Sequence, residues 1–66
     1  MNLETLKTNL ERIMKEREIT VAELQKTTGV SQNAIYDYLN LRHKPSMTNL
    51  MKLSQGLNVP LDELVN

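Results

Sequence analysis

The segment from Thr20 to Asn40 carries two helix-start signals with a helix-stop signal between them. Thr20 and Glu23 match a capping box, in which the threonine hydroxyl accepts from the Glu23 backbone N–H and the Glu23 carboxylate reaches back to the N–H of Thr20. Gly29 suits a left-handed position beyond a helix end because it has no Cβ, and Ser31 can cap a second helix. The sequence therefore predicts two short helices joined by a tight turn, over about 21–28 and 32–39.

Apolar residues recur at helical spacing on both sides of this segment. Upstream, the pattern predicts a helix over about 3–17. Downstream, Ser46 can cap a helix over about 47–56, which Asn58 can end in a left-handed conformation. Pro60 pre-sets the start of a short last helix. Because no alternating apolar run of useful length occurs, we expect an all-α fold of five helices.

The size and composition of the chain exclude several classes of protein. Its 66 residues make one domain, 1–66, and it has no cysteine for a disulfide or a thiolate zinc site. A single histidine, His43, cannot form a metal site alone, and the sequence offers no nucleophile–base pair and no phosphate loop. We therefore expect neither an enzyme nor a cofactor. No apolar run approaches the about 18 residues of a membrane span, and the start is not a signal peptide, so a cytoplasmic location is expected.

The charge of the chain is balanced, with 8 basic and 8 acidic side chains. Strong nucleic-acid binders are usually basic, which argues against that class. However, Asp37 is the single acid between Lys26 and Lys52, where Arg42 and Lys44 also lie. A locally positive face on a neutral body can bind phosphate, and the alternative is that these charges only keep the loops soluble.

Three parts of the chain resemble the lambda-repressor-like family of phage repressors, Cro proteins and XRE-type regulators. They are residues 20–40, Lys44-Pro45-Ser46 and the run NLMKLSQGLNVPLDELV, and the resemblance as a whole extends over nearly the whole chain. The resemblance implies a compact five-helix domain with a helix-turn-helix at about 20–40. It also implies a transcriptional regulator, usually a repressor, that binds a palindromic DNA operator as a dimer. A complete small regulator and a piece of a longer one both fit.

Three residues depart from the pattern of the family. Gln25 stands where the family usually has alanine, and its side chain must turn outward or widen the crossing of the two helices. Val21 stands where a glutamine often holds a backbone phosphate. Leu41 stands where a glycine commonly follows the Asn40 position, as a surface residue or as a small apolar contact to a partner.

The second helix of the motif has a polar face that can read bases. If Ile35 and Tyr38 face the core, the opposite face presents polar side chains to a DNA groove. Glutamine and asparagine can pair with adenine, tyrosine can contact a thymine methyl, and aspartate can accept from cytosine. Each of these residues can also be an ordinary solvated side chain. The base-reading set that we expect is Gln32, Asn33, Tyr36 and Asp37.

Two further sets complete the expected interface. Amide, cationic and hydroxyl groups after the motif can hold DNA phosphates, as can backbone N–H groups where the fourth helix begins. The phosphate set is Asn40, Arg42, Lys44, Ser46 and Thr48. The resemblance places the contact between subunits, which are expected to associate only weakly in solution, around the last helix. That set is Asn58, Val59, Pro60, Leu61 and Leu64.

A second hypothesis is a protein-interaction module, such as an antitoxin or anti-repressor domain with reduced DNA reading. The zero net charge, Val21 and Asp37 favour it. The hypotheses differ in partner, since the first requires duplex DNA and the second a protein.

Overall fold

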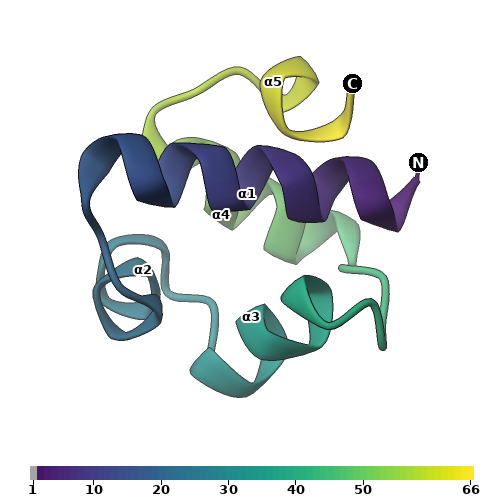
Figure 1. Ribbon diagram of the computed structural model, residues 1–66, viewed down its shortest axis with the longest axis horizontal. Helices are drawn as coiled ribbons and strands as arrows, with labels where there is room; N and C mark the ends of the chain where they lie inside the picture. The colour runs from purple at the N-terminus through teal and green to yellow at the C-terminus, as the bar shows by residue number, and fades with distance from the viewer. Residues whose placement is uncertain (1) are drawn as a thin grey trace.

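The computed structural model describes residues 2–66, which form five helices without a strand (Figure 1). The expected all-α, five-helix fold is therefore confirmed. The expected bounds hold except that the fourth helix runs one residue further, to Leu57, before Asn58 turns the chain. The helices are α1 (Leu3–Arg17), α2 (Val21–Thr28), α3 (Gln32–Leu39), α4 (Met47–Leu57) and α5 (Leu61–Val65).

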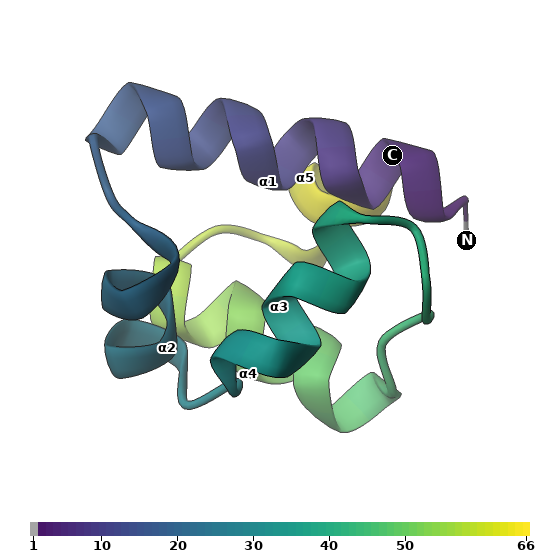
Figure 2. The ribbon, with the colours of Figure 1, turned by 60° about the horizontal axis from the view of Figure 1, so that its bottom comes forward.

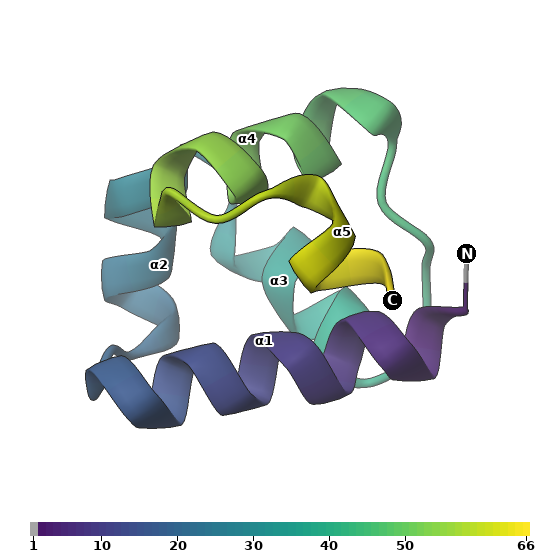
Figure 3. The same cartoon turned by 90° about the horizontal axis from the view of Figure 1, so that it is seen from above.

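The helices enclose a single core. The long helix α1 packs against α3 and α5, while α4 packs against α2 and α5. Seen from above, α1 and α4 lie on opposite sides of the molecule, with α5 between them (Figure 3). This arrangement leaves one side of α3 uncovered (Figure 2). The buried apolar residues of the core are Leu6, Leu10, Ile13, Leu24, Val30, Ile35, Tyr38, Leu50, Leu53, Leu57, Val59 and Leu64.

Side chains cap the helices as the sequence predicts. Thr20 Oγ1 accepts from the Glu23 N–H over 3.1 Å, and Glu23 Oε1 accepts from the Thr20 N–H over 2.9 Å. The hydrogen bonds from the backbone and the hydroxyl of Thr20 lower the pKa of Glu23, and Lys26 adds a smaller effect in the same direction. Ser31 and Ser46 cap α3 and α4 by accepting from the N–H groups of Ala34 and Asn49, without a reciprocal bond. Local sequence therefore sets where these helices begin.

Left-handed residues end four of the helices, and only one of these residues is glycine. Gly29 (φ 81°) and Asn58 (φ 55°) adopt the conformation that the sequence predicts. Glu18 (φ 54°) and Leu41 (φ 59°) adopt it as well, although neither residue type favours it. After Glu18, Leu41 and Asn58, the backbone N–H of the next residue bonds back to a helix carbonyl, as in Ile19 to Met14 O, whereas at Gly29 the N–H of the glycine itself bonds to Gln25 O. This bonding satisfies carbonyls that would otherwise lack partners at the helix ends.

Polar side chains fasten α5 and α4 to the long helix. The buried Asn9 donates from Nδ2 to the carbonyls of Leu64 (2.8 Å) and Asn66 (3.1 Å). At the other end of α1, Arg17 donates to the carbonyl of Leu57 over 2.6 Å. The sequence pattern did not point to this role for Asn9. None of the helices in the described chain is both long enough and apolar enough to traverse a lipid bilayer.

Candidate functional site

The outward side of α3 is a polar face on a helix that the core holds in place. Gln32, Asn33 and Tyr36 are exposed, and 45% of the Tyr36 surface is accessible. Ile35 has no accessible surface and Tyr38 only 3%. Figure 2 shows that no other element passes in front of this side of α3. The expected division of α3 into a core side and a free side is therefore present.

The start of α3 is braced from the preceding helix. Gln25 Oε1 accepts from the backbone N–H of Gln32 over 2.9 Å, and Ser31 Oγ accepts from that of Ala34 over 3.1 Å. Of the outcomes considered for Gln25, the side chain turns outward, and it remains exposed. This cap was missed because it joins residues in different helices. The only signal in the sequence was an amide shortly before Gly29, within reach of a tight turn.

The last turn of α3 is joined to α4 by a polar contact at the edge of the core. Tyr38 packs its ring inward, and its hydroxyl accepts from Asn49 Nδ2 over 2.7 Å. A buried tyrosine normally has such a partner for its hydroxyl. The bond links the helix that carries the exposed polar face to the first turn of α4, which begins after its cap Ser46 and includes Thr48. The two candidate contact regions are thus held in a fixed relation.

Two of the expected contact residues at the end of α3 already have partners. Asn40 Nδ2 donates to the Tyr36 carbonyl over 2.9 Å, so part of its amide is used within the helix. Arg42 Nε donates to Asp37 Oδ1 over 2.9 Å. Asp37 is half-buried, whereas the other three members of the base-reading set are exposed. The structure thus joins a predicted base reader to a predicted phosphate contact.

The loop after α3 and the first turn of α4 supply the remaining expected phosphate contacts. Lys44 and Thr48 are exposed, and their side chains bond to no other residue within 2–66. Ser46 is also exposed, but its hydroxyl accepts from the Asn49 N–H over 3.1 Å and so acts as the cap of α4. A lysine and a free hydroxyl therefore flank the face of α3 on this side.

The expected subunit-contact set divides into exposed and buried members. Asn58 and Pro60 are exposed, and Leu61 is half-buried. Val59 retains 8% of its accessible surface, and Leu64 has none, because both belong to the core. A partner can therefore touch Asn58, Pro60 and Leu61 but cannot reach the side chain of Leu64 in this fold.

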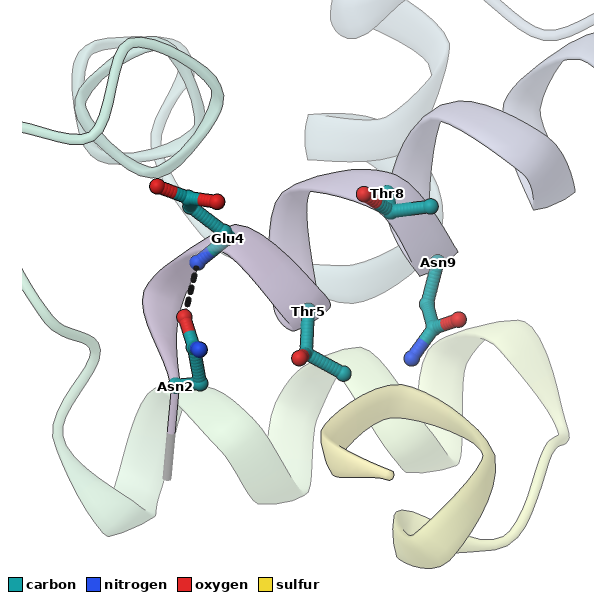
Figure 4. Close-up of a pocket in the computed structure, with 5 residues that line it drawn as sticks. All are labelled: Asn2, Glu4, Thr5, Thr8 and Asn9. Carbon is teal, nitrogen blue, oxygen red and sulfur yellow. Dashed lines mark hydrogen bonds between the residues drawn. The ribbon is translucent and has the colours of Figure 1, made fainter.

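A hollow of about 260 Å³ lies elsewhere, along the first half of α1 (Figure 4). Its lining shares no residue with the face of α3 and consists of Asn2, Glu4, Thr5, Thr8 and Asn9. Asn2 caps α1, and the Asn9 amide is bonded to carbonyls at the end of the chain. Within residues 2–66, no three histidine, cysteine or carboxylate side chains gather to hold a metal ion. Two of the hollow's lining side chains, Asn2 and Asn9, thus serve the fold.

Comparison with known proteins identifies the same region of the chain. A family model described as "Helix-turn-helix" matches residues 10–64, which include α2, α3, α4 and the braces between them. No curated protein and no solved structure matches the chain.

Proposed function

This chain belongs to the XRE-type, lambda-repressor-like helix-turn-helix family, and from that premise we propose that it regulates transcription by sequence-specific DNA binding. The family supports a DNA-binding regulator in general terms. The proposal adds that α3 enters the major groove and that the chain acts as a repressor. The observation that carries it is the exposed amide pair Gln32 and Asn33, on a helix whose opposite side is fully buried.

Base reading is assigned to the exposed tip of α3. The amides of Gln32 and Asn33 can each donate to adenine N7 and accept from adenine N6. Tyr36, one turn further along, can lie against a thymine methyl or donate to a phosphate. The braces from Gln25 and Ser31 support this role, because a helix whose start is fixed presents these side chains in one geometry.

Phosphate contacts fix the orientation of α3 in the groove without reading the sequence. We assign them to Arg42, Lys44 and Thr48, together with the remaining donor of Asn40 and the backbone near Ser46. Their exposure on the flank of α3 and the first turn of α4 supports this assignment. Because each contact releases counterions from DNA, affinity should fall steeply as the salt concentration rises.

The size of the molecule supports binding as a dimer. Its longest dimension is 24 Å, whereas the half-sites of a palindromic operator lie about 34 Å apart. One copy thus covers one half-site, and a second copy is needed for the other. Asn58, Pro60 and Leu61 are the expected residues that remain accessible for contact between the copies. So small an apolar surface implies weak association without DNA.

The test is selection from a pool of random duplexes at low and high salt. We expect a palindromic sequence to emerge, with binding that weakens as salt rises. The double variant Gln32→Ala with Asn33→Ala should lose the preference at one or two base pairs in each half-site, at about 1–3 kcal/mol each. The matched control is Thr8→Ala with Gln55→Ala, which removes exposed polar groups from α1 and α4. Failure to select any sequence would overturn the proposal.

The zero net charge favours a protein-interaction module as the second candidate. The same selection separates the two functions. A protein module would bind duplexes weakly, without sequence preference, and its residual DNA affinity would be the same in the Gln32 and Asn33 double variant.

A further inference from the structure

Asp37 and Arg42 are joined at two points beside the exposed face of α3. Arg42 Nε donates to Asp37 Oδ1 over 2.9 Å, and the Arg42 backbone N–H donates to the Asp37 carbonyl over 2.8 Å. The second bond belongs to the turn that Leu41 makes in its left-handed conformation. Both the backbone and the guanidinium of Arg42 are therefore held by Asp37, the backbone by a carbonyl and the guanidinium by the carboxylate.

We propose that Asp37 is a positioning residue, which acts on DNA through Arg42 and does not read a base itself. This inference rests on the proposed function and names the residue that aims one of its phosphate contacts. Asp37 lies four residues after Asn33, on the same side of α3 as Asn33 and Tyr36. An arginine fastened to it lies at the edge of the base-reading face, where the backbone of a DNA duplex passes.

The chemistry of guanidinium suits this double role. Arg42 bonds Asp37 through Nε, and its Nη atoms bond to no other residue within 2–66. The side chain of Arg42 is 58% exposed, so these nitrogens remain accessible to a phosphate. A lysine has a single nitrogen and cannot hold a carboxylate and a phosphate in this forked geometry. Fixing the arginine before binding also reduces the conformational entropy lost on contact with DNA.

The ion pair also explains how an acid can stand beside a DNA-binding face. An unpaired carboxylate there would repel phosphates, and Asp37 is the single acid between Lys26 and Lys52.

The three roles open to Asp37 predict different results when the carboxylate is removed. A merely repulsive acid predicts tighter binding to all sequences, and a base reader predicts a changed preference at one base pair. A positioning residue predicts weaker binding with the preference unchanged.

The experiment uses the full chain and the duplex that it selects. Affinity is measured on a series of duplexes in which one phosphate at a time is replaced by a neutral methylphosphonate. The variants are Asp37→Ala, Asp37→Asn, Arg42→Ala and Arg42→Lys. The matched control is Glu16→Ala, which removes the acid from the exposed Arg12–Glu16 pair on α1, where the nitrogen and oxygen lie 3.0 Å apart. Thermal midpoints should stay close to that of the parent chain, because exposed ion pairs contribute little to stability.

For the parent chain, we expect one methylphosphonate near the end of α3 to weaken binding about tenfold. That sensitivity should disappear in Arg42→Ala and in Asp37→Ala, and be strongly reduced in Arg42→Lys. Asp37→Asn keeps an acceptor oxygen for Arg42 and should restore most of it. Glu16→Ala should leave the whole profile unchanged.

The failures of the two proposals are distinguishable. If the parent chain selects no sequence, the proposed function fails first. If it selects a sequence but Asp37→Ala retains the phosphate sensitivity, binds all duplexes more tightly or changes a base preference, the positioning role is overturned.

Discussion

Leu41 holds a left-handed backbone conformation, with φ 59°, at the turn that ends α3. For a residue with a Cβ this conformation costs about 1–2 kcal/mol, and 43% of the Leu41 surface is exposed, so little packing offsets the cost. Leu41→Gly should therefore raise the free energy of unfolding by about 0.5–1 kcal/mol, since glycine relieves the strain but is freer in the unfolded chain. Thermal and urea denaturation would measure this change in the free energy of unfolding.

Asn58→Gly is the matched control, because Asn58 has a similar φ of 55° and asparagine tolerates it better. The increase in the free energy of unfolding should be smaller for Asn58→Gly than for Leu41→Gly. A loss of stability in Leu41→Gly would show that the leucine side chain makes contacts worth more than the backbone strain.

Gly56 lies where α4 packs closely against the end of α2. A Cβ at this position would lie 2.6 Å from Thr28 Cα and 2.7 Å from the Thr27 carbonyl oxygen, both of which are backbone atoms that cannot move alone. Alanine normally stabilises a helix interior relative to glycine by about 1 kcal/mol. Here the sign should reverse, and Gly56→Ala should lower the free energy of unfolding by about 1–3 kcal/mol as the helices separate.

Urea denaturation of Gly56→Ala would be compared with that of Gln55→Ala, which changes the exposed neighbouring residue on the same helix. The control should be neutral or slightly stabilising. An increase in the stability of Gly56→Ala would mean that α2 and α4 can separate at no cost.

At the scale of single helices, the sequence predicts those features that depend on residues close together in the chain. The capping box at Thr20, the caps at Ser31 and Ser46 and the apolar stripes each follow from residues within one or two helical turns. The core position of Tyr38 follows from its spacing to Ile35. These local signals were sufficient for five helices and for the free face of α3.

Contacts between different helices, or across a turn, could not be predicted from these local signals. Gln25 caps a different helix, and the glycine at position 56 is required by a backbone in α2. Asp37 and Arg42 were assigned to separate tasks, because the sequence cannot show that the Leu41 turn brings them together. Likewise, Leu64 was included in the subunit contact because the resemblance places that contact around the last helix, whereas the fold leaves its side chain without accessible surface.

The stability of the whole domain depends on how α5 is held against α1. α5 has only five residues, too few to be stable alone, and Asn9 bonds two carbonyls at its end from within α1. Asn9→Leu keeps the branching of the side chain and its number of heavy atoms but leaves these carbonyls without their donor. We expect a loss of about 1–3 kcal/mol, and a midpoint lower by about 4–8 °C for each kcal/mol in a domain of this size.

The same variant links stability to dimeric binding, because Leu61 and Pro60 stand at the start of the helix that Asn9 fastens. A loosened α5 should reduce cooperative binding to a full palindrome more than binding to a single half-site, whose proposed contacts lie on α3, the loop after it and the first turn of α4. Thermal denaturation and binding to both duplexes would be measured beside Thr8→Ala, the adjacent exposed residue on α1. An equal loss on both duplexes would assign the effect to general unfolding, and an unchanged midpoint would show that Asn9 does not hold α5.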